Sequence, residues 1–85
     1  MRNNIENEIL NLANEFTLLP KEDYENIKMF INNNEAGEAF ETLCSQLFEK
    51  DIKISLQTYN TIEKIGISIG MSDSSWAYLQ RSIIS

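Results

Sequence analysis

Hydrophobic residues recur along this chain at intervals of three and four, the spacing of one face of an α-helix. The pattern is strongest over residues 32–51, where polar residues occupy the opposite side of the same helix. The apolar side carries Ala36, Ala39, Phe40, Leu43, Cys44 and Leu47. The polar side carries Glu35, Glu38, Thr42, Ser45, Gln46 and Glu49. The pattern predicts a central helix that packs through one side and leaves the other open to a partner.

The same spacing predicts four further helices, two before the central one and two after it. Pro20 separates the first two, because the residue before a proline avoids helical geometry and proline suits the first position of a helix. Gly70 is expected to end the fourth, because glycine enters left-handed geometry cheaply. The predicted ranges are about 3–16, 20 or 21 to 31, 56–69 and 74–84.

The stretch 51–55 alternates between polar and apolar residues and could be mistaken for a strand. It is short and has no evident partner in the sequence. We expect an extended connector in which Ile52 and Ile54 enter the core, while the Ser55 hydroxyl caps the next helix. Gly66, inside that helix, is expected to admit a close neighbour.

The last helix has a polar start and an apolar side. Ser72 or Asp73 can cap it, and Trp76, Leu79 and Ile83 are expected to face inward. We interpret the tryptophan as a core residue rather than an anchor for a partner.

Length and composition fit one small globular domain. A chain of 85 residues can bury about 60 to 65 per cent of its unfolded surface, which leaves nothing for a second core. Its 42% hydrophobic and 24% charged residues are typical of a folded protein rather than a disordered one. We therefore expect an all-α fold: a small single-domain bundle of about five short helices over residues 1–85.

The charge balance is acidic. Thirteen acidic and seven basic residues give a net charge of -6, which repels phosphate backbones and favours basic partners. Direct binding of nucleic acid is not expected, since it depends on Lys and Arg at the phosphates. The excess charge could also serve solubility alone.

The usual catalytic side chains are missing from the sequence. With no histidine and one cysteine, the chain cannot form a Cys-His pair, a Ser-His triad or the common zinc sites. Cys44 falls on the apolar side of the central helix, where a thiol behaves as a small hydrophobe. We expect no enzyme activity, no catalytic residues, no cofactor and no metal.

The cysteine count and the lack of long apolar runs predict where the protein is located in the cell. A single cysteine cannot form an intramolecular disulfide, and no apolar run has the length of a signal peptide or of a membrane span. We expect a cytoplasmic protein that does not contact the membrane.

Acidic residues gather at the predicted starts of the second and central helices, where the helix dipole favours them. That placement has a structural explanation, but the central helix also has no compensating lysine before Lys50. We predict an acidic surface directed at a Lys/Arg-rich protein groove. The predicted contact residues are Glu22, Asp23, Glu35, Glu38, Glu41 and Glu49.

A set of residues between about Leu19 and Leu79 resembles the MafI family of immunity proteins. The strongest element is the pattern Glu-x-Gly-x-Ala-x-Glu-x-Leu-Cys, which runs here from Glu35 to Cys44 with its central glutamate at Glu41. The residues that carry the likeness are 34–49, 52–55, Tyr59, 62–66, Gly70, Met71 and Trp76.

The resemblance implies a small helical protein encoded beside a polymorphic or contact-dependent-inhibition toxin, similar in role to the CdiI immunity proteins. Its partner would then be a cognate toxin C-terminal domain, most commonly a nuclease and above all an RNase. Glu35, Glu38 and Glu41 would pair with basic residues that otherwise hold RNA phosphates. Binding away from the toxin's catalytic centre is the other mode that the resemblance allows.

Other functions stay open on the residues alone. One is a helical adaptor or regulatory protein without a toxin partner. Another is a homodimer that uses exposed apolar residues such as Tyr78 and Ile84, although no feature of the sequence specifically indicates a homo-oligomer. A weak carboxylate hydrolase built on Glu38 and Glu41 is the third, and single Glu→Gln changes would abolish its turnover.

Overall fold

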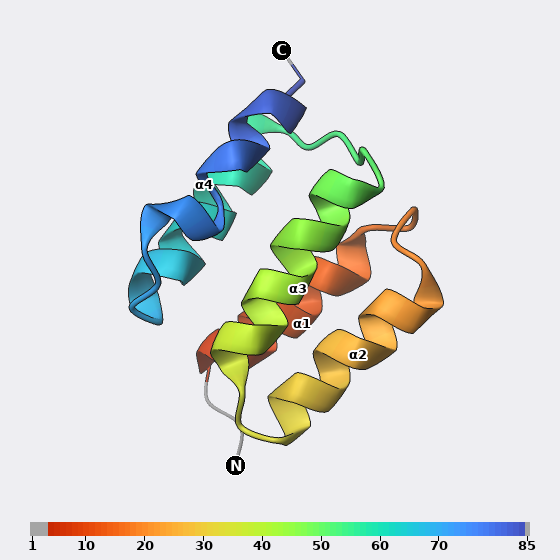
Figure 1. Ribbon diagram of the computed structural model, residues 1–85, viewed down its shortest axis with the longest axis vertical. Coiled ribbons are helices and arrows are strands. Elements are labelled where there is room, and N and C mark those ends of the chain that lie inside the picture. The colour runs from red at the N-terminus through yellow and green to blue at the C-terminus, as the bar shows by residue number, and fades with distance from the viewer. Residues whose placement is uncertain (1–3, 85) are drawn as a thin grey trace.

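The computed structural model describes residues 4–84, in which four α-helices are followed by two short 3₁₀ helices (Figure 1). The elements are α1 (Asn4–Glu15), α2 (Lys21–Asn32), α3 (Ala36–Glu49), α4 (Leu56–Ser68), η1 (Asp73–Ser75) and η2 (Ala77–Ser82). The predicted all-α bundle is confirmed. Residue Asn3, the predicted start of the first helix, lies outside the described residues. None of the helices in the described range is long and apolar enough to cross a membrane.

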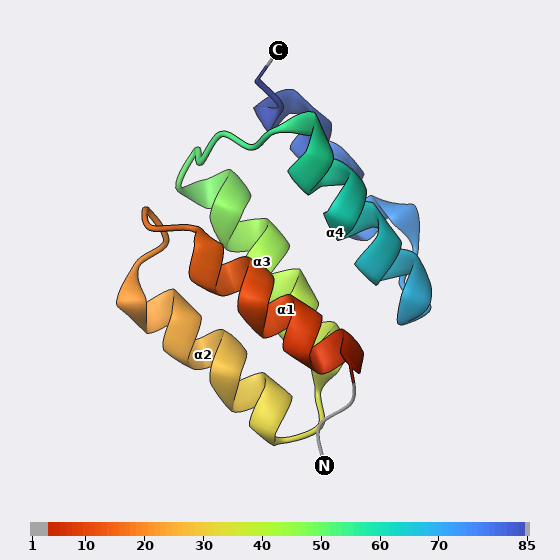
Figure 2. The same cartoon turned by 180° about the vertical axis from the view of Figure 1, so that it is seen from behind.

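Helix α3 is the centre of the bundle. It runs antiparallel to α2, and α1 lies behind this pair in the view of Figure 1. Helix α4, η1 and η2 lie on the side of α3 away from α2 (Figures 1 and 2). The apolar side of α3 is buried as the spacing predicts, except that Ala36, the first residue of the helix, is only half-buried. The buried residues are Ala39, Phe40, Leu43, Cys44 and Leu47.

Helices α2, α3 and α4 end in the same way. Each is followed by a residue in left-handed geometry: Asn34 with φ 62°, Asp51 with φ 53° and Gly70 with φ 78°. The residue after each of these donates its backbone amide to a carbonyl in the last turn of the helix, as from Met71 N–H to Gly66 O at 3.0 Å. The prediction that Gly70 ends its helix is confirmed, and Asn34 and Asp51 do the same at the short polar turns.

The connector between α3 and α4 is extended, as expected. Ile52 and Ile54 are both buried in the core. The Ser55 hydroxyl accepts a hydrogen bond from the Thr58 amide at 3.0 Å, so Ser55 caps α4 through its side chain.

The connector does have a partner, contrary to expectation. Ile54 forms a parallel β-bridge with Ile83, in which its amide donates to Ser82 O and its carbonyl accepts from the Ile84 amide, both at 2.9 Å. A single bridged pair is too local to leave an alternating pattern in the sequence. It ties the C-terminal segment to the top of the bundle.

The last segment is helical where predicted but is not an α-helix. Trp76, with φ -139°, interrupts the range 74–84 and separates η1 from η2. A 3₁₀ helix repeats every three residues, and the buried positions here are Trp76, Leu79 and Ser82. Ile83, predicted to face inward, is half-buried and lies in the extended bridge that follows η2.

Gly66 admits the close neighbour that the sequence suggested. A Cβ atom at this position would lie 2.5 Å from Trp76 Cε3 and 3.1 Å from Phe40 Cζ, far inside normal contact. The Trp76 ring therefore lies directly on the α4 backbone, and Phe40 packs edge-on against it at a centroid distance of 6.1 Å. This contact fixes where η1 and η2 sit relative to α3 and α4.

Candidate functional site

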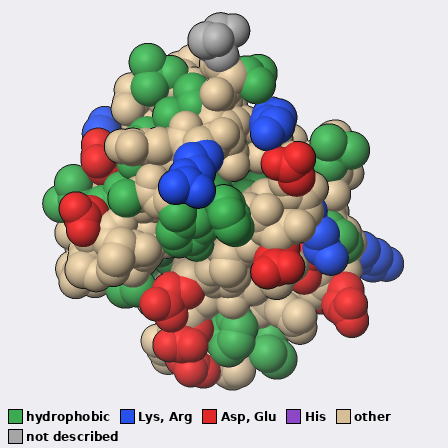
Figure 3. Space-filling model, turned by 45° about the horizontal axis from the view of Figure 1, so that its top comes forward, with side chains coloured by type: hydrophobic (Ala, Val, Ile, Leu, Met, Phe, Trp, Pro, Cys, Tyr) green, Lys and Arg blue, Asp and Glu red, His purple; other side chains and the backbone are tan. Residues whose placement is uncertain are grey.

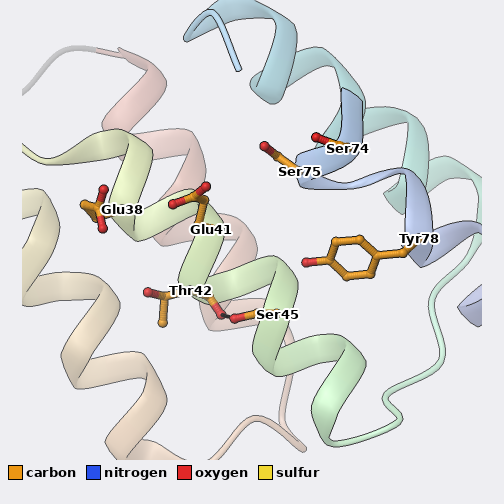
Figure 4. Close-up of a pocket in the computed structure, with 7 residues that line it drawn as sticks. All are labelled: Glu38, Glu41, Thr42, Ser45, Ser74, Ser75 and Tyr78. Carbon is orange, nitrogen blue, oxygen red and sulfur yellow. Dashed lines mark hydrogen bonds between the residues drawn. The ribbon is translucent and has the colours of Figure 1, made fainter. Parts of the chain in front are cut away.

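An open polar groove of about 410 Å³ lies between α3 and the two 3₁₀ helices (Figure 4). Side chains three and four positions apart on α3 form one wall, because they share a face of the helix. The opposite wall comes from η1 and η2, with the Tyr78 ring extending across toward α3. The lining residues are Glu38, Glu41, Thr42, Ser45, Ser74, Ser75 and Tyr78.

The groove is rich in hydrogen-bond acceptors and contains no positive charge. Two carboxylates and five hydroxyls line it, with no Lys or Arg among them. Neither Glu38 nor Glu41 forms an ion pair within residues 4–84. The salt bridge in this part of the chain joins Lys53 Nζ to Asp51 Oδ1 at 3.1 Å, and both of its residues are exposed and lie outside the groove. Such a lining fits a cationic group from outside the chain.

Two of the hydroxyls are partly engaged within the protein. The Ser45 hydroxyl donates to Thr42 O at 3.3 Å, and the Ser74 hydroxyl is 2.9 Å from that of Ser72. Both oxygens keep free lone pairs and can still accept a hydrogen bond.

Tyr78 closes one end of the groove and joins it to an aromatic pair. Its ring packs edge-on against Phe48, with centroids 5.2 Å apart and planes at 82°. Phe48 itself is 45% exposed, so the pair presents apolar surface to solvent. Burial raises the pKa of Tyr78 to about 12, with smaller contributions from Cys44 and Glu41. The hydroxyl is neutral at physiological pH, as it would be with an ordinary tyrosine pKa, and can both donate and accept a hydrogen bond.

Cys44 lies behind the α3 wall and takes no part in the groove. It is fully buried, as predicted, and burial raises the pKa of its thiol to about 12, with Glu41 adding to the effect. Only the thiolate is nucleophilic, so this cysteine is inert in the folded protein.

The raised pKa values of Cys44 and Tyr78 predict that the stability of the fold decreases as pH rises in the alkaline range. A native state that holds a proton more tightly than the unfolded state loses this advantage as pH rises, from about 9 to about 12 for Cys44. We expect the urea midpoint, followed by circular dichroism, to fall over this range. In Cys44→Ala the midpoint at pH 7 should be lower because of the cavity, but its fall with pH should be shallower. If the urea midpoints of the two proteins fell in parallel with pH, ionisation of the Cys44 thiol would not contribute to the loss of stability.

The groove brings together two of the six predicted contact residues, Glu38 and Glu41. Glu35 is exposed at the residue before α3 and makes no side-chain cap. It lies close to Glu38 along the chain but does not line the groove.

The other three predicted residues lie elsewhere. Glu22 and Asp23 are in the first turn of α2, and Glu49 is the last residue of α3, so all three are at the far end of the antiparallel pair (Figure 1). At a rise of about 1.5 Å per residue, Glu49 is roughly 16 Å along the helix from Glu38. One carboxylate oxygen of Asp23, Oδ2, is buried and so faces away from any partner.

The second wall of the groove was not predicted. Ser74, Ser75 and Tyr78 gave no sign in the sequence that they would face α3. The polar positions Thr42 and Ser45, by contrast, follow from the helical spacing of the exposed side of α3.

Large hydrophobic side chains are also exposed, but they are spread over several elements. Figure 3 shows hydrophobic, acidic and basic side chains interspersed on one face of the molecule. The residues concerned are Leu18, Met29, Phe48, Leu56, Ile67 and Ile84. Among them, Phe48 is the one whose ring contacts a residue of the groove.

Comparisons with protein-family models, curated proteins and solved structures gave no match to this chain. Within the described residues, no group of three or more Asp, Glu or Cys side chains could hold a metal ion.

Proposed function

We propose that this chain is an immunity protein that binds a cognate toxin domain and blocks it. The observation that carries the proposal is the groove between α3 and η1–η2, where Glu38 and Glu41 face solvent beside five hydroxyls and no cation. Because neither carboxylate forms an ion pair within residues 4–84, both are available to a cationic side chain of another protein.

The resemblance to immunity proteins supports the same reading. Its strongest element is the pattern from Glu35 to Cys44, and the central glutamate of that pattern, Glu41, stands in the groove. Of the other residues of the pattern, Ala39, Leu43 and Cys44 are buried in the core, Gly37 is half-buried, and Glu35 is exposed just before α3.

Electrostatics supplies the mechanism. A nuclease holds RNA phosphates with Lys and Arg, and these are the residues that the groove glutamates would attract. Occupying them would deny the phosphates their partners. The net charge of -6 would also accelerate the encounter with a basic domain and make its rate fall with added salt.

Co-expression with the product of the adjacent gene tests the proposal. If that product is the toxin, its expression alone should stop growth, and this chain should restore growth and co-purify with it. An adjacent product that is harmless, or one whose toxicity this chain does not relieve, would contradict the immunity function. Complex formation with a harmless neighbour would favour an adaptor instead.

A further inference from the structure

The groove continues along α3 into apolar surface. Glu38, Glu41, Ser45 and Phe48 follow one another at intervals of three and four, so they form a single ridge roughly 15 Å long at about 1.5 Å per residue. Its first part is acidic and lines the groove. Its last part is the exposed ring of Phe48, held edge-on by Tyr78.

We infer that the groove and this ridge together bind an arginine of the partner and an apolar side chain next to it. The guanidinium lies in the groove between Glu41 and Tyr78, and the apolar side chain covers Phe48. The inference deepens the proposed function, since it rests on the groove being the contact site.

Arginine fits the lining better than lysine. The groove offers acceptors on both walls, the carboxylates of Glu38 and Glu41 on one side and the hydroxyls of Ser75 and Tyr78 on the other. A guanidinium has five donors in a plane and can engage both walls at once, whereas an ammonium is a compact point charge with a strongly held water shell. The Tyr78 ring adds a face on which a guanidinium stacks well.

The apolar part of the occupant follows from Phe48. Phe48 is 45% exposed although its ring makes a T-shaped contact with Tyr78, so a partner side chain can still remove apolar area from water there. A lone charge in the groove would leave this surface uncovered.

Three short blocked peptides, added to the isotope-labelled protein, test the inference by NMR: acetyl-Arg-Leu-amide, acetyl-Lys-Leu-amide and acetyl-Arg-Gly-amide. We expect the Arg-Leu peptide to bind with a Kd on the order of 1 mM. It should shift the amides of Glu41, Thr42, Ser75 and Tyr78, and bind at least threefold more tightly than either of the others. Equal affinity for the Arg-Leu and Lys-Leu peptides would overturn the inference, as would shifts spread over all acidic residues.

Two variants separate the parts of the site. Glu41→Gln should weaken all three peptides at least threefold, whereas the matched change Glu22→Gln, at the start of α2, should have no effect. Phe48→Ala should remove the preference for leucine over glycine and keep the preference for arginine over lysine. Unchanged binding in Glu41→Gln would contradict the inference directly.

The peptide titration and the co-expression experiment test the two proposals separately. If the peptides bind as expected but the adjacent gene product is not neutralised, the groove recognises arginine and the immunity function is wrong. If the toxin is neutralised while the peptides do not distinguish arginine from lysine, the immunity function stands and the inference about the groove is wrong.

Discussion

Reversing both groove glutamates, as Glu38→Lys with Glu41→Lys, is expected to weaken the complex with the toxin domain at least 100-fold and to abolish protection of growth. In the proposed complex, the lysines would face the basic residues that the carboxylates are proposed to bind, and like charges brought together at an interface disfavour binding by several kcal/mol. A loss of about 2.7 kcal/mol already corresponds to 100-fold in Kd. Calorimetric titration and a growth assay measure the two effects.

A matched double variant separates the groove from the overall charge. Glu22→Lys with Glu25→Lys changes the net charge by the same amount, also at exposed residues near the start of a helix. It should slow association at low salt but leave the Kd within about fivefold of wild type, since the change acts through the long-range field alone. Equal losses in the two doubles would mean that the groove is not the contact site. Circular dichroism should show unchanged helix content in both.

Gly66→Ala is expected to destabilise the fold by about 2 kcal/mol, although alanine is the better helix former by about 1 kcal/mol. The added methyl would collide with Trp76 Cε3 at 2.5 Å, and the Trp76 ring cannot retreat because it is buried against Phe40. Urea unfolding followed by the fluorescence of this single tryptophan measures the effect.

Gly37→Ala is the control for that change. A Cβ atom at Gly37 would lie 3.6 Å from Met71 Sδ, which is ordinary van der Waals contact. This variant should gain helix propensity without a collision and be as stable as wild type, or up to about 1 kcal/mol more stable. If Gly66→Ala behaved in the same way, the close packing of Trp76 on α4 would be wrong.

The helices could be predicted because their signals are local. The buried side of α3 follows from residues three and four apart, and the stop at Gly70 follows from one residue's freedom to adopt left-handed geometry. The last segment was harder, because the spacing of Trp76 and Leu79 fits an α-helix and a 3₁₀ helix equally well. The two differ at the next inward position, where the structure buries Ser82 instead of the more hydrophobic Ile83.

Of the two walls of the groove, only the one formed by α3 could be predicted from the sequence. Glu38 and Glu41 stand on the exposed side of a helix whose orientation the hydrophobic pattern fixes. The facing wall depends on contacts between segments far apart in the sequence, above all Trp76 on Gly66 and the bridge between Ile54 and Ile83. No periodicity encodes such contacts, so the hydroxyls of η1 and η2 were not predicted.

The bridge between Ile54 and Ile83 has a consequence for synthesis of the protein. The acidic ridge on α3 is complete early, but its facing wall is held in place by residues near the end of the described range. At roughly 5–20 residues per second, a ribosome needs about 2–7 s to pass from Phe48, the end of the ridge, to Ile83. A nascent chain during that interval presents the carboxylates without the facing wall, so the groove to which we assign the proposed function forms only after this region has been translated.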